Sequence, residues 1–306
     1  MTQPAGSLHS KSSDVWIFAN PISGKGQGRV IAHRLERSLA KDGLQPKLFL
    51  DKASVIDDRI LSQPARAAIV IGGDGTLRTV ADRFIAHDIV PPPILPIGLG
   101  TANLMVRHLG LNWDRTNLES EVTSAISNLR VRELDAGRTN GRLFLLMVGI
   151  GFDAQVVHEL DRMRSGPIGW LSYVPPAALA LHEFSPQPMQ VIVDGEEVWS
   201  MAPGLAFVGN VREYGVGFPV LPFATPDDGL FDICVLPCES RAQLIRLFLH
   251  AIAGEHLIGH GSVYLRGKHV QISGSRSIPV QIDGDPGGHT PVEINLLPFR
   301  VPFIVR

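Results

Sequence analysis

The residues best suited to chemistry lie in a glycine-rich segment after a short apolar run. Residues 67–71 (AAIVI) precede Gly72, Gly73, Asp74, Gly75 and Thr76, and apolar residues recur at helical spacing from Leu77. A strand, a glycine turn and a helix leave backbone N–H groups available to bind a phosphate. The Asp74 carboxylate would repel that phosphate unless a cation lay between them. The segment therefore indicates a Mg²⁺-nucleotide site, the alternative being a plain turn with Asp74 or Thr76 as helix N-cap.

Two other segments have the same form. Residues 15–20 and 94–97 predict strands, followed by loops over residues 21–28 and 98–103. Strands alternating with helices at this spacing favour a parallel sheet, which binds ligands at the carboxyl ends of its strands. We therefore expect all three loops at one edge of one sheet.

The segments between these loops fit the same α/β unit. Ile31, Leu35 and Leu39 recur at four-residue spacing and predict a helix that Gly43 closes. A second strand is expected over residues 44–50 and a short helix over residues 56–61.

Beyond about Arg130 the pattern changes to short apolar or alternating runs separated by Asp-Gly turns. This pattern is typical of an antiparallel β domain, sandwich-like or barrel-like. The expected strands cover residues 143–150, 189–193, 205–208, 230–236, 263–265, 270–272 and 280–282. Helices are expected over residues 154–163 and 241–253, the second with an apolar face of Leu244, Leu247, Phe248 and Ala251.

Bulk composition limits the classes of protein. A chain of 306 residues with 44% apolar and 19% charged residues predicts a globular protein of two domains. A net charge of −2 argues against nucleic-acid binding by bulk electrostatics. Cys234 and Cys238 are expected to be free thiols in a reducing cytosol. The first residues have no apolar core of a signal peptide, and residues 168–181 are too few to span a bilayer, so we expect a cytoplasmic protein.

The ordered set of motifs resembles the soluble lipid kinases related to bacterial diacylglycerol kinases and to sphingosine and ceramide kinases. The resemblance runs nearly end to end and is more specific than GGDGT alone, which NAD kinases share. The matching motifs are NPISG (residues 20–24), GGDGT (72–76), PIGLGTAN (96–103), GIGFDA (149–154), the run from Tyr214 to Asp232, and IDG (282–284).

This resemblance implies a fold and a domain division. The expected fold is an N-terminal Rossmann-like α/β domain and a C-terminal antiparallel β-sandwich-like domain, with the active site in the cleft between them. Residues 1–13 would form a disordered leader and residues 14–134 the nucleotide-binding domain, to which residues 298–306 return. Residues 135–297 would form the lipid-substrate domain.

The resemblance also implies ATP and Mg²⁺ as cofactors and assigns the site residues. The catalytic carboxylates would be Asp285, Asp74 and Asp135, the alternative for Asp135 being a buried cap. A Mg²⁺ site would use the Asp228 carboxylate and main-chain oxygens of Thr225 and Leu230, although Asp228-Gly229 is also a good hairpin turn. The nucleotide would contact Asn20, Pro21, Ile22, Ser23, Gly24, Lys25, Gly72, Gly73, Asp74, Gly75, Thr76, Leu77, Arg78, Thr79, Gly100, Thr101 and Asn103.

Four residues at three places in the sequence depart from the family pattern. Asp285 stands where the family usually has a Glu that takes the hydroxyl proton, so its reach is one methylene shorter. Leu104 replaces an Asp found in many relatives. Arg78 and Thr79 replace a common Asn-Glu pair; Arg78 either touches phosphate or is a solvated helix residue, and the second interpretation is favoured.

The expected function is transfer of the ATP γ-phosphoryl group to a lipid hydroxyl at a membrane surface, where Arg162 and Arg164 could meet anionic headgroups. Diacylglycerol, phosphatidylglycerol, a sphingoid base and ceramide all fit as acceptors. The alternatives are an NAD kinase and a catalytically weak nucleotide- or lipid-sensing relative. No nucleic-acid partner is expected, and exposed strand edges favour a homodimer.

Overall fold

The computed structural model describes residues 12–21, 23–51, 57, 61, 63–85, 91–163, 170–215, 217–258 and 261–306, except for the side chains of Lys25 and Trp170. It divides the chain into two compact units. The first comprises Met1–Leu134 and Arg300–Arg306, and the second comprises Asp135–Phe299. Most of the expected leader and of the helix over residues 56–61 lies outside the described residues.

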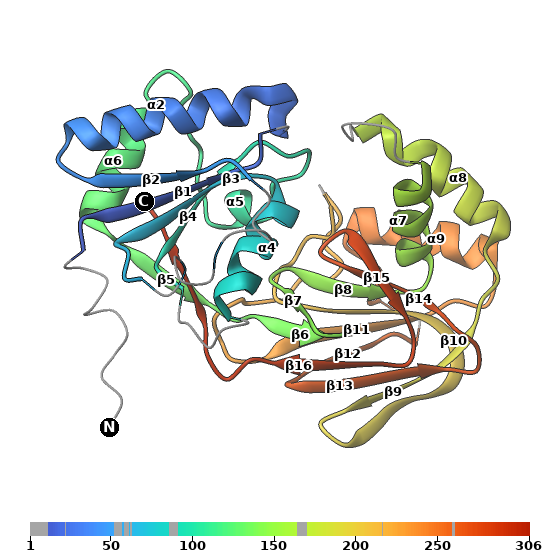
Figure 1. The fold of residues 1–306 in the computed structure, drawn as a ribbon. Helices are drawn as coiled ribbons and strands as arrows, with labels where there is room; N and C mark the ends of the chain where they lie inside the picture. Colours follow the sequence, from blue (N-terminus) through green and yellow to red (C-terminus); the bar gives the residue numbers. More distant parts are fainter. Residues whose placement is uncertain are drawn as a thin grey trace. The chain divides into compact units, whose positions relative to one another are not determined.

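The first unit contains a mostly parallel sheet with the strand order β2-β1-β3-β4-β17-β5 (Figure 1). The strand β17 comes from the end of the chain; it runs parallel to β4 and antiparallel to β5. The central strands are almost entirely apolar because both faces of the sheet are covered. The strands are β1 (Asp14–Ala19), β2 (Gln45–Phe49), β3 (Ala67–Gly72), β4 (Ile94–Gly98), β5 (Val131–Leu134) and β17 (Val301–Ile304).

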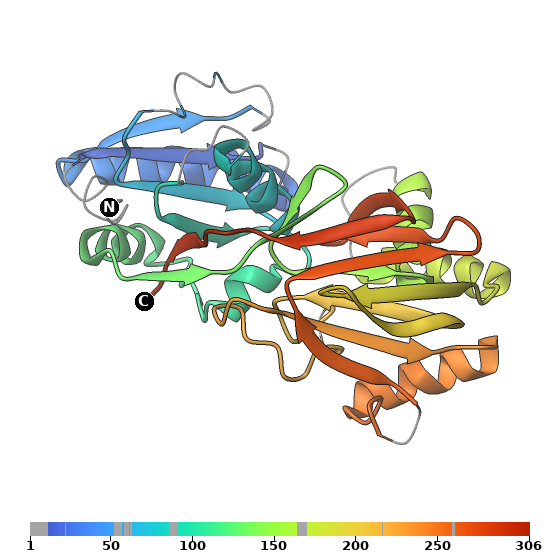
Figure 2. The same cartoon turned by 90° about the horizontal axis from the view of Figure 1, so that it is seen from below.

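Helices α2 (Gln27–Lys41) and α4 (Asp74–Ile85) lie on opposite faces of this sheet (Figures 1 and 2). The predicted apolar face of α2 is confirmed, since Ile31, Leu35 and Leu39 are buried. Helix α4 begins at Asp74, earlier than its apolar period indicates, because its first turn is polar and glycine-rich. The unit also contains η1 (Ser23–Gly26), α5 (Leu104–His108) and α6 (Leu118–Asn128).

The second unit is an antiparallel β structure in which one long strand, β10 (Glu196–Gly209), belongs to two layers. Its first half pairs with β9, and its second half, from Gly204, pairs with β8 and β11. Register shifts between Glu197 and Ala202 mark the change of layer. The other strands are β6 (Gly137–Thr139), β7 (Arg142–Phe144), β8 (Met147–Ile150), β9 (Pro188–Val193), β11 (Phe231–Pro237), β12 (Val263–Gly267), β13 (His269–Gly274), β14 (Pro279–Ile282), β15 (Asp285–His289) and β16 (Val292–Leu296).

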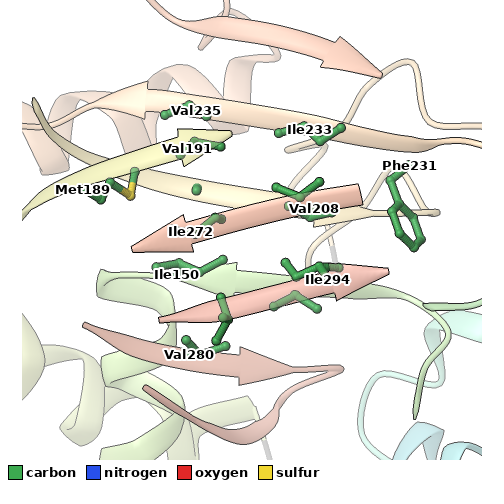
Figure 3. Close-up of a cluster of buried hydrophobic side chains, with 14 of the residues drawn as sticks. Ile150, Met189, Val191, Val208, Phe231, Ile233, Val235, Ile272, Val280 and Ile294 are labelled. Carbon is green, nitrogen blue, oxygen red and sulfur yellow. The ribbon is translucent and has the colours of Figure 1, made fainter. Parts of the chain in front are cut away.

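A single apolar core fills the space between these layers (Figure 3). Alternate side chains of facing strands, such as Val191 of β9, Val208 of β10 and Ile272 of β13, are fully buried in it. This arrangement confirms the predicted fold class of an α/β part and an antiparallel β-sandwich-like part.

The elements of the second unit correct three expectations. The unit contains α7 (Phe152–Met163), η3 (Trp170–Tyr173), α8 (Val174–Glu183) and α9 (Arg241–Ala253), of which α8 was not predicted. The run over residues 143–150 is two strands, β7 and β8. Phe248 was expected on the buried face of α9 but is 49% exposed. No helix among the described residues has the length and apolarity needed to cross a membrane.

Candidate active site

The three glycine loops of the first unit meet at the carboxyl edge of its sheet. The Leu99 N–H donates to the Gly72 carbonyl at 2.8 Å, which ties the loop after β4 to the end of β3. A Cβ placed on Gly100 would lie 2.8 Å from the Gly73 Cα. Gly24 lies beside the Leu99 side chain, since its Cβ would be 3.3 Å from the Leu99 Cβ, and its φ of +59° favours glycine. Glycine is therefore required at position 100 by the approach of two backbones and favoured at position 24 by its backbone angle.

Asp74 links two of these loops through its side chain. Its carboxylate accepts hydrogen bonds from the Leu104 N–H at 3.0 Å and the Met105 N–H at 3.1 Å. Asp74 therefore caps α5, which follows the third loop, and not the helix in which it lies. Burial raises the pKa of Asp74, although these backbone N–H groups oppose the change. The two bonds use one lone pair of each oxygen, so the carboxylate keeps capacity for a cation.

Several residues predicted to contact the nucleotide have their side chains engaged in the loops themselves. Asn103 bonds the Gly100 N–H and carbonyl at 2.7 and 2.8 Å, and the Thr79 hydroxyl donates to the Gly75 carbonyl at 2.8 Å. Leu77 is part of the core, 2% exposed. These residues hold the loops, and any contact of Leu77 with a ligand is limited to its main chain.

Arg78 corrects the sequence interpretation, because it is buried, at 6% exposed, and is not a solvated helix residue. Asn20 donates its backbone N–H to Ile71, and Thr101 lies on the exposed part of its loop. Ile22 and the Lys25 side chain, two of the predicted contacts, lie outside the described residues.

A hollow of about 570 Å³ lies beside α2 and α5. It borders Gly98, Leu99 and Asn103 but neither Gly73 nor Asp74. Because it does not reach the loop that carries Asp74, the meeting point of the glycine loops is the better candidate for binding a phosphate chain.

In the second unit, Asp135 lies against the predicted metal loop. The buried Asp135 carboxylate accepts the Gly229 N–H at 2.7 Å, and its backbone N–H donates to the Pro226 carbonyl at 2.6 Å. Both contacts stabilise the turn, so the interpretation of Asp135 as a buried cap agrees with its geometry.

The residues of the metal loop offer oxygen atoms, as Mg²⁺ prefers, but one carboxylate is already engaged. Asp228 accepts the Leu230 N–H at 3.1 Å and forms an ion pair with Arg266 at 3.4 Å. Among the described residues, no group of three or more His, Cys, Asp or Glu side chains could hold a metal ion. A cation at Thr225, Asp228 and Leu230 would thus compete with the Arg266 guanidinium.

Asp285 begins β15 in a tight hairpin with β14. Its carboxylate is 42% exposed and lies 4.0 Å from an Arg142 nitrogen. The turn is fixed by Asp283, whose carboxylate accepts the N–H groups of Leu145, Leu146 and Met147 at 2.8 to 2.9 Å. Asp283 has a φ of +49°, which an Asp in a turn tolerates. The geometry presents Asp285 on a rigid hairpin with its side chain accessible.

Comparison with known proteins decides the family. The diacylglycerol kinase catalytic domain matches residues 14–139, and the YegS C-terminal NAD kinase beta sandwich-like domain matches residues 146–305. A diacylglycerol kinase of Mycobacterium tuberculosis is 30% identical over 93% of this chain and 92% of its own. The chain belongs to the diacylglycerol kinase family. It is a lipid kinase, as the sequence predicted.

Other members of the diacylglycerol kinase family agree with this assignment. A probable lipid kinase YegS-like protein of Pseudomonas fluorescens is 30% identical over 75% of this chain and 76% of its own. A crystal structure of a Bacillus anthracis diacylglycerol kinase has a TM-score of 0.72 and 25% identity, covering 97% of this chain and 98% of the other.

The sequence did not assign a role to three polar side chains that hold the segments around Asp285 and Asp135. Asp283 was noted only as part of the IDG motif and its Asp-Gly turn, although its carboxylate accepts three backbone N–H groups. Gln281 accepts the Gly284 N–H at 2.8 Å, and Asn210 donates to the Asp135 carbonyl at 2.9 Å. Their partners are distant in sequence or depend on the turn, so local patterns do not reveal them.

Proposed function

We propose that this lipid kinase transfers the γ-phosphoryl group of ATP to a lipid hydroxyl in a Mg²⁺-dependent reaction. The observation that carries the proposal is the meeting of three glycine loops beside the partly buried Asp74 carboxylate. Backbone N–H groups and the α4 N-terminus favour an anionic phosphate chain there. A Mg²⁺ ion, when bound, would neutralise phosphate charge and align the transferred group.

The remaining roles follow from the side chains. Asp74, with its unused lone pairs, would hold the cation beside the phosphates, and the oxygens of Thr225, Asp228 and Leu230 would hold a second. Asp285 would accept the proton of the lipid hydroxyl as its oxygen bonds to the γ-phosphorus. ADP leaves when the bond from that phosphorus to the bridging oxygen breaks, so charge and atoms balance.

We propose diacylglycerol as the first acceptor to test, because several relatives carry the name diacylglycerol kinase. Phosphatidylglycerol, a sphingoid base and ceramide present a hydroxyl on a similar apolar body, so they form the comparison set.

An exposed face of α9 supports contact with a membrane. Ile245, Phe248, Leu249 and Ile252, at the i, i+3, i+4, i+7 spacing of one helix face, are 48% to 59% exposed. The helix also carries Arg241 and Arg246 and no acidic residue. Apolar side chains flanked by arginines fit the interface of an anionic bilayer, where the substrate lies. The Arg162 and Arg164 region was predicted for this role, but Arg162 pairs with Glu159 at 2.7 Å and residues 164–169 lie outside the described part of the chain.

The test is a lipid panel with γ-labelled ATP and thin-layer separation. We expect label in one acceptor class with MgCl₂ and none with excess EDTA. The Asp74→Asn variant should lose at least about 100-fold in rate if its carboxylate holds the cation. Absence of labelled lipid with every acceptor, while nucleotide binds, would overturn the proposal in favour of a sensing protein. NAD phosphorylation would overturn it in favour of the other enzyme class.

A further inference from the structure

Asp153 and Gln281 form a buried polar pair in the second unit, and the functions described above give Asp153 no role. Asp153, at the start of α7, is 8% exposed, and Gln281, in β14, is fully buried. Three side-chain atoms of this pair have no hydrogen-bond partner of normal geometry among the described residues. They are the two Asp153 carboxylate oxygens and the Gln281 Nε2. Unpartnered polar atoms in a core cost free energy, so a pair of them calls for an explanation.

The two side chains face each other across Gly149. A Cβ on Gly149 would lie 1.8 Å from the Asp153 Oδ2 and 2.7 Å from the Gln281 Nε2. The two polar atoms are therefore within 4.5 Å of each other, the sum of those distances. Only glycine leaves room for this approach, which gives the first glycine of the GIGFDA motif a steric reason.

The other end of the Gln281 amide reaches the hairpin turn that carries Asp285. Its Oε1 accepts the Gly284 N–H at 2.8 Å, directly before Asp285. Reversing the amide would set the NH₂ group against the Gly284 N–H and the oxygen against the Asp153 carboxylate. Both contacts would then be repulsive, so a carboxylate at position 153 selects the orientation that holds the turn.

We propose that Asp153 is a positioning residue for the phosphoryl transfer. It orients the Gln281 amide, and the amide fixes the Gly284–Asp285 turn so that the Asp285 carboxylate meets the acceptor hydroxyl. The inference rests on the proposed function, because Asp153 acts through Asp285, the residue that takes the proton in that function.

Two further observations support this role. Burial raises the pKa of Asp153 to about 7, and the neighbouring Ala154 N–H and Gln281 amide only partly oppose it. Burial, and to a smaller extent the Asp153 charge, raises the pKa of Tyr214, which belongs to another predicted family segment. The carboxyl thus lies where burial makes it costly to ionise.

The decisive experiment compares kcat and the lipid KM of four variants with the wild type. Asp153→Leu removes the acceptor, and we expect kcat to fall about 10- to 100-fold, as for a small misplacement of a reacting group, with the lipid KM within about twofold of the wild-type value. Gln281→Glu keeps an acceptor for the Gly284 N–H but sets two carboxylates face to face, and a similar fall is expected. Adding Asp153→Asn to Gln281→Glu restores a donor–acceptor pair and should recover most of kcat. Asp161→Asn, at an exposed position of the same helix, is the control and should match the wild type.

The outcomes separate the inference from the function on which it rests. If Asp285→Ala is inactive while Asp153→Leu keeps its kcat within twofold, the inference is overturned and the function stands. Failure of the double variant to recover kcat, although it melts like the wild type, also overturns it. If Asp153→Leu does not fold, the comparison of Gln281→Glu with the double variant decides the question alone. If the wild type transfers no phosphoryl group to any lipid, the proposed function itself is overturned.

Discussion

Asp285 is the side chain on which the proposed chemistry depends most directly. Replacing it with Ala removes the proton acceptor but leaves Asp283, which holds the turn, in place. We expect kcat to fall about 10²- to 10⁴-fold without a change in ATP affinity. Steady-state kinetics with nucleotide-binding calorimetry measures both quantities. An unchanged kcat would remove Asp285 from the mechanism, and Asp285→Glu, which restores the family's usual residue, should be at least as active as the wild type.

Asp153 makes stability depend on pH in a direction that its environment fixes. Burial raises its pKa from 3.8 to about 7, so the folded protein binds this proton more tightly than the unfolded chain. Its contribution to the free energy of unfolding is then most favourable below about pH 4 and declines as the pH rises through about 7. Asp153→Asn does not ionise at this position. Its free energy of unfolding relative to that of the wild type should therefore rise by about 2 to 3 kcal/mol between pH 5 and pH 8.

Urea unfolding at both pH values measures this difference, with Asp161→Asn as the control. A stability difference that stays the same at pH 5 and pH 8 would contradict the pKa. If Asp153→Asn is more stable than the wild type at pH 8 while the active site depends on the ionised Asp153, this position trades stability for function.

At the scale of elements, α9 carries the surface that we assign to the membrane. Replacing Phe248 and Ile252 with Ser removes two half-exposed apolar side chains. Binding to vesicles that contain anionic lipid should weaken at least about tenfold, because each side chain contributes about 1 kcal/mol or more when buried in the interface. Vesicle co-sedimentation measures the change, and Val30→Ser, at a 60% exposed position of the first unit, is the matched control.

If the α9 variant keeps its vesicle binding but dissociates a dimer in sedimentation velocity, the face belongs to a second copy of the chain. That result would contradict the membrane assignment. It would support the homodimer that the exposed strand edges had indicated.

The elements that sequence reasoning found are those whose local pattern is unambiguous. Apolar runs followed by glycines located β1, β3 and β4, and four-residue spacing located α2. Helix α8 was missed because its apolar residues surround two prolines, a composition that resembles a break. Prolines are tolerated in the first turn of a helix, and the two prolines of α8 lie there.

The site was predictable as a set of loops but not as a set of contacts. The Asp74 carboxylate was correctly placed among the glycines, yet its partners lie some thirty residues away in α5. Asp228 could be assigned to a turn, but its ion pair with Arg266 joins distant segments. Long-range partners of this kind depend on tertiary packing, which spacing along the chain does not encode.

At the scale of the whole molecule, the first unit depends on the last residues of the chain. The strand β17 lies between β4 and β5 and is entirely buried. Ending the chain after Phe299 should expose the edges of both neighbours and abolish the cooperative thermal transition of this unit, and nucleotide binding with it. Differential scanning calorimetry tests this expectation, and removal of the partly exposed Arg306 alone should lower Tm by only a few degrees.

The return of β17 also bears on biosynthesis. A ribosome releases the amino-terminal strands long before the segment that completes their sheet, so this layer stays open while the whole second unit is translated. A nascent chain should therefore gain nucleotide affinity only after β17 has been synthesised, and until then chaperones can bind the unpaired strands of the first unit.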